Sequence, residues 1–330
     1  MTETTLATQV PALRHALALD GRGGGVELDW AALQGPDPQG RVVWVDLFYD
    51  HDEARRWVDA QTDIPAVARE AMLEHQSRPG MFEYENGFLL ILRAVNLNEG
   101  ERPEDMISLR LWVDERRVIT CRRRVLQSLR TLAQCLQRGE GPERPGAMVS
   151  DVVGELAQRI NIVDQQLNEA LLEIEVDDDD LEASGVEDSL SALRRRSAVL
   201  RRYLAPQKEA MSRLQQYRGN LLQAQDRQEI QMHADTMMRS LEDIELVREQ
   251  VLSLQDELFN RLAMAQNARM YLLSIIAAIF LPMTFLTGLL GMNVGGIPLA
   301  GSPFGFAVIA GMAVCLAGLL WFLFKRTRWL

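Results

Sequence analysis

The chain has 330 residues, of which 47% are hydrophobic and 25% charged, so it has room for about two domains and is neither disordered nor collagen-like. The formal net charge of −11 argues against nucleic-acid binding, and three Cys residues without paired spacing argue against a disulfide framework or a zinc finger. All 46 Asp and Glu residues precede residue 270, and residues 270–324 carry no charged side chain. We therefore expect an acidic soluble part followed by a part that lies in lipid.

The acidic part is expected to begin with a flexible tail, residues 1–25, and to continue as a compact α/β or α+β domain, residues 26–146. Runs rich in β-branched and aromatic residues predict its strands, and helical stretches fall between them. The predicted strands span residues 41–47, 81–85, 88–97, 108–114 and 118–121, and the predicted helices span 52–60, 64–76 and 125–138. The Gly- and Pro-rich run 139–146 is expected to be a linker.

Residues 147–225 are expected to form a helical hairpin on the cytoplasmic side. Its first helix is predicted over residues 148–176 and its second over 186–222, with an interruption near Pro206. Between them lies an acidic tip around residues 177–180. Two interpretations of this tip remain open: it attracts cations, or it is simply a solvated turn.

A stalk helix is predicted over residues 226–269 and continues without a breaker into the apolar segment. A sustained seven-residue repeat of apolar side chains is typical of helices that wind around each other, so we expect this stalk to need partner helices and the protein to be a symmetric homo-oligomer. A helix over residues 226–290 is on the order of 100 Å long, of which a bilayer uses about 30 Å. The repeat consists of Ile230, Met237, Ile244, Val251, Leu258 and Ala265.

Two membrane-spanning helices are predicted, over residues 270–290 and 304–324, joined by a Gly- and Pro-rich outer loop, residues 291–303. A buried hairpin of a soluble protein is the alternative, but neither segment shows the polar face of a soluble helix. Basic residues flank the pair, with Arg269 before it and a basic tail, residues 325–330, after it. Because positive residues stay inside, both termini are expected in the cytoplasm and the protein in the inner membrane.

The first predicted span carries a stripe of polar and small side chains on one face. Polar groups within hydrocarbon usually face an interior, which indicates the lining of a pore at the axis of an oligomer. Small residues also serve helix packing, and the stripe alone does not separate these two interpretations. The stripe, called here the first-span stripe, consists of Asn267, Met270, Ser274, Ala277, Leu281, Thr284 and Gly288.

No side chain of the first-span stripe is a strong metal ligand, so an ion passing it is expected to remain largely hydrated. Apolar constrictions at Met270, Leu273 and Leu281 are expected to gate by dewetting. Elsewhere, His233 with Asp235 is the one pair worth testing for zinc. The sequence shows no phosphate-binding loop, dinucleotide motif or nucleophile motif, so no enzyme activity and no bound cofactor are expected.

The segment 279–285 (IFLPMTF) and the tripeptide Gly291-Met292-Asn293 at the end of the first span resemble the CorA superfamily of divalent-cation transporters. The resemblance covers the α/β domain, acidic hairpin, stalk, two spans and basic tail. The following residues, 294–298 (VGGIP), are more similar to the zinc-transporting ZntB branch than to the magnesium branch. In one respect the chain departs from the family, because its outer loop carries no acidic residue to concentrate cations.

The resemblance implies a homopentamer with a cytoplasmic funnel, whose first span lines the pore. It implies that Asn293 rings the outer mouth, that Gly291 permits a tight turn there and that Met292 supports the loop. Asp256 matches a stalk position that binds a regulatory ion between subunits. The pore-facing positions implied are Asn267, Met270, Leu273, Leu281 and Thr284.

The function expected is transport of divalent metal ions, foremost Zn²⁺. The alternatives are a Mg²⁺/Co²⁺ channel of the same architecture, or a membrane-anchored coiled-coil sensor or scaffold without a pore. Transported or regulatory ions would be Zn²⁺, with Mg²⁺, Co²⁺, Ni²⁺ and Cd²⁺ as further candidates. The expected partners are identical subunits, metal ions and the lipid bilayer.

Overall fold

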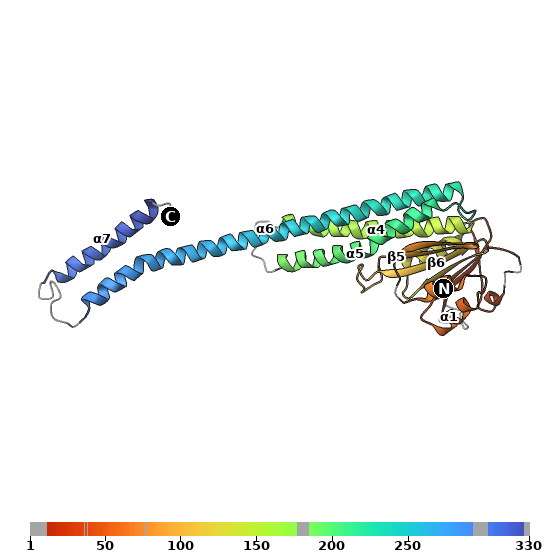
Figure 1. The fold of residues 1–330 in the computed structure, drawn as a ribbon, viewed down its shortest axis with the longest axis horizontal. Coiled ribbons are helices and arrows are strands. Elements are labelled where there is room, and N and C mark those ends of the chain that lie inside the picture. Colours follow the sequence, from red (N-terminus) through yellow and green to blue (C-terminus); the bar gives the residue numbers. More distant parts are fainter. Residues whose placement is uncertain are drawn as a thin grey trace. The chain divides into compact units, whose positions relative to one another are not determined.

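The computed structural model describes residues 12–35, 37, 39–75, 77–176, 185–292 and 303–326, with the side chains of 175–176 and 323–326 left out. The chain divides into two compact units, Met1–Gln255 and Asp256–Leu330. The first combines a β-sheet with helices, and the second contains the two apolar helical segments. Figure 1 labels several elements of the two units.

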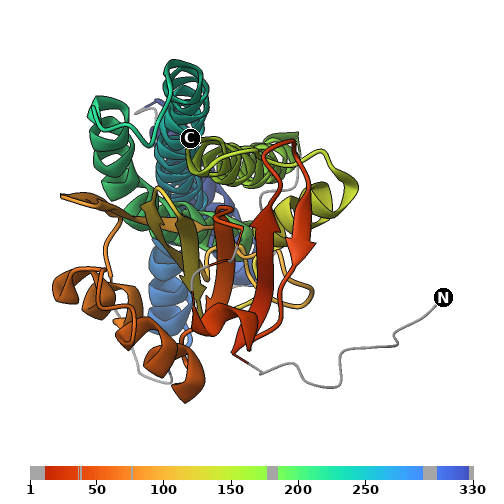
Figure 2. The ribbon, with the colours of Figure 1, turned by 90° about the vertical axis from the view of Figure 1, so that its right-hand side faces the viewer.

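A seven-stranded sheet forms the centre of the first unit, in the order β2-β1-β3-β7-β6-β5-β4. Only β3 and β7 pair in parallel, and every other neighbouring pair is antiparallel. Helices α1 and α2 cover one face of the sheet, and the long helices lie on the other (Figure 2). The strands are β1 (Leu13–Leu19), β2 (Gly25–Glu27), β3 (Val43–Phe48), β4 (Gly80–Tyr84), β5 (Gly87–Ala94), β6 (Ile107–Asp114) and β7 (Arg117–Arg122).

The sequence prediction of a flexible tail over residues 1–25 is wrong for its second half. Strand β1 lies inside the sheet, where it pairs with both β2 and β3, and its residues 16–19 are buried. The turn after it is held by the Asp20 carboxylate, which accepts hydrogen bonds from the backbone N–H of Arg22 and Gly24. Small alanines and the polar pair Arg14-His15 hide the apolar alternation that predicts a strand. Residues 1–11 lie outside the described part of the chain.

The other predicted strands and the short helices are confirmed, with boundaries shifted by one to three residues. Helix α1 spans Asp52–Asp59, α2 spans Ala66–Leu73 and α3 spans Gln127–Arg138. A 3-10 turn, η1 (Ala32–Gln34), precedes β3, and the indole N–H of Trp57 in α1 donates to the carbonyl of Leu33 within it (3.0 Å). Helix α1 is thereby fastened to the segment before β3, against the apolar core between sheet and helices.

A buried ion pair joins the two parallel strands. The guanidinium of Arg122 in β7 binds the carboxylate of Asp46 in β3 with its Nη2 2.6 Å from Oδ2, and both residues are at most 2% exposed. The Thr120 hydroxyl donates to the same carboxylate (2.8 Å), and the Trp44 indole N–H donates to Thr120 (3.1 Å). Since each polar group has a partner, the cluster fixes the register of β3 on β7.

Three long helices complete the first unit: α4 (Pro145–Val176), α5 (Val186–Gln216) and the first part of α6 (Ala224–Leu290). Helix α5 runs through Pro206 without the predicted interruption. Its neighbours Leu204 and Gln207 are buried, and Gln207 accepts a hydrogen bond from the backbone of Arg93 (2.6 Å). Packing against the sheet therefore maintains the helix despite the N–H that proline lacks. The predicted acidic tip falls on residues 177–184, outside the described residues.

The seven-residue repeat of α6 is filled by the chain itself. Ile230, Met237, Ile244 and Val251 are all at most 4% exposed within a single copy. Helices α4 and α5 supply the partners: Ser150 of α4 donates a hydrogen bond to Glu229 of α6 (3.1 Å), and Arg201 of α5 pairs with Glu245 of α6 (2.6 Å). The inference from this repeat to partner subunits is therefore wrong for the first unit, because three helices of one chain already bury the apolar side chains of the repeat. The homo-oligomer stays a prediction on other grounds.

Carboxylates gather where α4 meets α6. Burial, and then the charges of Glu229, Glu155 and Asp226, raise the pKa of Asp151 from 3.8 to about 6. Burial likewise raises the pKa of Asp164 to about 6, with a contribution from Asp243 on α6. A carboxyl with a raised pKa favours the folded state while it is protonated, and that contribution is lost as the pH rises through the raised pKa.

The substitution Asp151→Asn is expected to stabilise the protein by about 2 kcal/mol at pH 8, once solvent screening of this half-buried site is allowed for. The gain should fade between pH 6 and pH 4, where Asp151 becomes protonated in both states. Thermal unfolding of the full chain in detergent at several pH values measures it. The exposed Asp235 on α6 provides the control, since Asp235→Asn should change nothing. Equal shifts at pH 4 and pH 8 would contradict the prediction.

Candidate functional site

Two helical segments of the second unit are long and apolar enough to cross a membrane, by length and composition, among the described residues. The first is the C-terminal part of α6, which continues through Pro282 to Leu290. The second is α7 (Gly305–Arg326). The end of α6 at Leu290 and both ends of α7 lie within two residues of the predicted spans 270–290 and 304–324, and Figure 1 shows both segments in blue.

The first-span stripe occupies one fully exposed face of α6 in the single chain. Met270 is 58% exposed and Leu281 is 76% exposed, and Leu273 beside the stripe is 65% exposed. The five other members, Asn267, Ser274, Ala277, Thr284 and Gly288, are exposed as well. The structure thus brings the predicted pore residues together along one side of one helix.

Several positions of the same segment, mostly on the side of α6 away from the stripe, are partly covered. They are Ile275, Ala278, Ile279, Pro282, Met283 and Leu286. Within one copy the stripe is therefore open to other molecules, as are apolar side chains such as Ile276 and Phe280 beside it.

The hydroxyl groups of the stripe have a defined orientation. Ser274 donates to the backbone carbonyl of Met270 (2.9 Å), and Thr284 donates to that of Phe280 (2.9 Å). A hydroxyl has one hydrogen and two lone pairs, so these oxygens are left to act as acceptors. Acceptor oxygens suit the outward-pointing hydrogens of water bound to a cation. The same bonds also satisfy the hydroxyls if the surroundings are lipid or protein.

The Gly291-Met292-Asn293 motif is described only in its first two residues. The N–H of Gly291 donates to the Thr287 carbonyl (2.9 Å), and a Cβ at Gly291 would lie 2.9 Å from that oxygen. This contact is tighter than side chains normally make, which agrees with the tight turn expected of Gly291. Met292 is 47% exposed. Asn293 and the outer loop up to residue 302 lie outside the described residues.

No preformed metal centre is present among the described residues, since no three His, Cys, Asp or Glu side chains come together suitably. Asp256 is exposed on α6. The suggested zinc pair is wrong, because His233 and Asp235 point to different sides of the helix. His233 lies against Gly154 of α4, where a Cβ would be 2.8 Å from its Nε2, whereas Asp235 is exposed. Burial also lowers the pKa of His233.

One hollow in the first unit was not anticipated from the sequence. A cavity of about 780 Å³ opens beside η1 and the start of β3, with Trp30, Trp57, Arg116 and Arg117 among its lining residues. Its lining residues lie in three separate stretches of the chain, within 28–45, 53–63 and 116–117, so no local sequence pattern predicts it. The aromatic and arginine residues are the only sequence signal, and they are scattered over 88 positions between Trp30 and Arg117.

Comparison with known proteins gives a consistent result. The profile of the family described as "CorA-like Mg2+ transporter protein" matches residues 39–326. The divalent cation transporter CmaX of Pseudomonas aeruginosa is 37% identical over 322 residues, covering 96% of this chain and 97% of that protein. The zinc transport protein ZntB of Yersinia enterocolitica is 32% identical over 327 residues, covering 98% of each.

Solved structures agree with these relatives. The full-length CmaX structure superposes with a TM-score of 0.86 at 35% identity, covering 98% of this chain and 100% of that one. The CorA magnesium transporter of Methanocaldococcus jannaschii superposes with a TM-score of 0.80 at 20% identity, covering 96% of this chain and 99% of that one. The second likeness concerns the fold alone.

Proposed function

Because this chain belongs to the CorA family of divalent cation transporters, we propose that it carries Zn²⁺ through a pore lined by the C-terminal part of α6. Membership makes the protein a transporter rather than an enzyme, and it removes the alternative of a scaffold without a pore. The identity of the ion, the number of subunits and the orientation in the inner membrane belong to the proposal.

The observation that carries the pore is the composition of the exposed face of α6. Along it, small side chains and hydroxyl acceptors alternate with Met270 and Leu281. Identical faces turned toward a common axis produce rings of acceptor oxygens separated by apolar rings. The rings of acceptor oxygens accept hydrogen bonds from the water shell of an ion. The apolar rings close the path by dewetting when the passage narrows.

The proposed ion crosses in largely hydrated form. None of the first-span stripe residues is a carboxylate, imidazole or thiolate, so nothing there replaces the inner water shell of a divalent ion. Weak, repeated contacts of this kind allow an ion to leave each site as readily as it enters. At the outer mouth, the proposed contact is the amide oxygen of Asn293.

The proposed assembly is a homopentamer with both termini in the cytoplasm. The basic residues around the spans support this orientation, because Arg269 precedes the first and Lys325 follows the second. A second copy also provides cover for the face of α6 that one chain leaves exposed. Asp256 is proposed to bind a regulatory cation between subunits in this assembly.

Zinc is proposed over magnesium because of residues 294–298 and the similarity to ZntB along the whole chain. The competing candidate is a Mg²⁺/Co²⁺ channel, which the family description favours. The CmaX relative, described only as a divalent cation transporter, does not separate the two.

Reconstituted vesicles test the proposal directly. Purified full-length protein, first weighed by native mass spectrometry, is expected to contain five chains. In vesicles loaded with an ion-sensitive dye, we expect Zn²⁺ entry well above that of protein-free vesicles and above Mg²⁺ entry at equal concentration. Mg²⁺ entry faster than Zn²⁺ entry would favour the competing candidate, and a monomer without flux would contradict the pore itself.

A further inference from the structure

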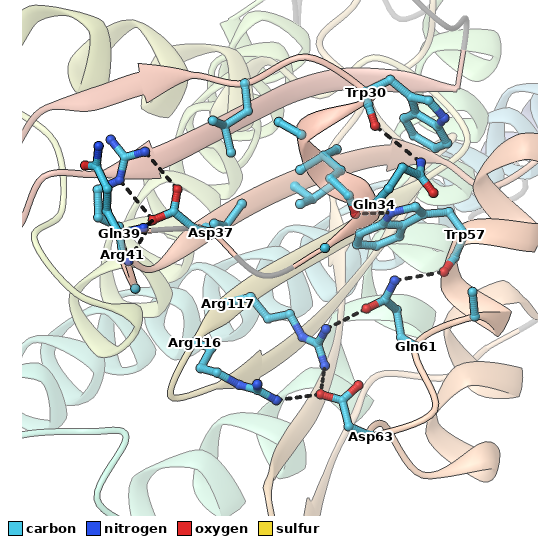
Figure 3. Close-up of a pocket in the computed structure, with 18 of the residues that line it drawn as sticks. Trp30, Gln34, Asp37, Gln39, Arg41, Trp57, Gln61, Asp63, Arg116 and Arg117 are labelled. Carbon is cyan, nitrogen blue, oxygen red and sulfur yellow. Dashed lines mark hydrogen bonds and ion pairs between the residues drawn. The ribbon is translucent and has the colours of Figure 1, made fainter.

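The cavity of about 780 Å³ in the first unit has the size of a ligand site, since pockets for small organic molecules measure roughly 300–1,000 Å³. It is lined by the segment after β2, by η1, by the start of β3, by the end of α1 and by the turn between β6 and β7 (Figure 3). None of these elements contributes to the first-span stripe or to the motif after it. The cavity therefore calls for an explanation of its own.

One wall of the cavity is apolar and partly aromatic. Leu28, Trp30 and Val43 pack against the core but remain half-exposed where they line the cavity. The rings of Trp30 and Trp57 lie 6.4 Å apart between centroids. The hydrogen bond from Trp57 to Leu33 fixes this wall in place. Trp57 is buried and its ring is tilted 48° to that of Trp30, so the partly exposed Trp30 is the ring available to stack with a flat ligand.

The other side of the cavity carries a pair of neighbouring arginines, Arg116 and Arg117. The guanidinium groups of Arg116 and Arg117 both bind Oδ2 of Asp63, at 2.7 and 2.6 Å, as Figure 3 shows. Among the described residues, Arg116 thus shares its one carboxylate partner with Arg117, which has a second one in Asp114. Arg117 is held further by Gln61 (2.6 Å) and by Asp114 (3.0 Å). The other charged side chains of the lining form ion pairs with each other. The Arg41 guanidinium lies 2.8 Å from the Asp37 carboxylate, and the Arg56 guanidinium lies 3.9 Å from the Glu53 carboxylate.

Arg116 is the group suited to bind a ligand. Its side chain is 70% exposed, and in the described contacts it uses one of the five N–H donors of a guanidinium. Its backbone N–H donates to Asp114 (2.9 Å), which holds the turn in position. A guanidinium with several N–H groups available forms strong, charge-assisted bonds to phosphate or carboxylate oxygens.

We propose that this cavity binds a small organic anion built on a flat ring system, and that a nucleoside monophosphate represents the class. The ring lies against Trp30, which packs on the buried Trp57, and the anionic group binds Arg116. Recognition needs both halves, because the aromatic wall offers no charge and the arginine pair offers no apolar surface.

The test uses the full-length protein in lipid nanodiscs, titrated with adenosine monophosphate by isothermal calorimetry. This probe combines a ring with a single phosphate, which chelates metal ions only weakly. Adenosine and inorganic phosphate each supply one half of it. We expect the monophosphate to bind at least tenfold more tightly than either half. No binding at millimolar concentration, or equal binding of inorganic phosphate alone, would overturn the proposal.

Variants locate the site. Trp30→Ala and Arg116→Gln are each expected to weaken binding about tenfold, by removing ring stacking and a charged hydrogen bond respectively. The matched control is Arg123→Gln, which removes an exposed arginine that pairs with Asp50 outside the cavity lining. It should bind like the unaltered protein. Because Arg116 is mostly exposed, its loss should leave the circular dichroism spectrum unchanged. Unchanged affinity in both cavity variants would overturn the proposed location.

Discussion

The substitution Asn293→Ala is expected to lower metal flux in vesicles by at least about 100-fold. The outer loop contains no Asp or Glu, so the Asn293 amides are the side chains proposed to draw a hydrated cation toward the mouth. In a homopentamer one substitution removes five of them at once. A loss of about 3 kcal/mol summed over five polar contacts with the entering ion is enough for this effect.

A matched control lies at the end of the same span. Thr287 is exposed but lies off the first-span stripe, and its hydroxyl donates to the Met283 carbonyl (3.1 Å). Thr287→Ala removes a polar group near the motif without altering the proposed ring of amides, so flux should stay within about twofold. Equal losses in the two variants would indicate damage to the helix end and would contradict the role of Asn293. Native mass spectrometry checks that both variants still assemble.

The largest loss of stability is expected from Asp46→Asn. The change leaves the Arg122 guanidinium buried at 2% exposure without its counter-charge. Breaking a buried ion pair from one side costs about 3–5 kcal/mol, which for a unit of this size lowers the unfolding midpoint by about 10 °C. Thermal unfolding of the full chain in detergent measures this shift.

Two further variants separate the buried charge from the general effect of substitution. The pair Arg123–Asp50 has a similar distance, 2.7 Å, but its side chains are 54% and 38% exposed. Asp50→Asn should therefore cost less than about 1 kcal/mol. Replacing both buried partners, Asp46→Leu with Arg122→Met, should recover most of the loss, because no unpaired charge remains. A double variant as unstable as Asp46→Asn would show that packing, not charge, dominates.

Local patterns predicted the elements of this fold well where one signal dominates. The helices α4 and α6 and both apolar segments follow from periodicity and hydropathy, and β5 and β6 follow from their aliphatic runs. The failures share one cause, which is packing from distant parts of the chain. Strand β1 is stabilised by pairing with β3, and α5 passes through Pro206 because flanking residues are buried against the sheet.

The candidate pathway was predictable as a helix face, because the spacing of its members alone places them on one side of α6. Features built from distant residues were not. Asp46 and Arg122 are 76 positions apart, and the arginine pair and tryptophans of the cavity meet only through the fold. His233 and Asp235 show the opposite error. They are two residues apart in sequence, and this spacing places their side chains on different sides of the helix.

The burial of the seven-residue repeat of α6 within one chain has a consequence for folding during synthesis. Ile230, Met237, Ile244 and Val251 are buried within one polypeptide. The first unit of a nascent chain can therefore fold as soon as this part of α6 leaves the ribosome. In the proposed homopentamer, copies synthesised at different times would associate after folding, so subunits from an inactive allele would enter mixed pentamers and lower their transport.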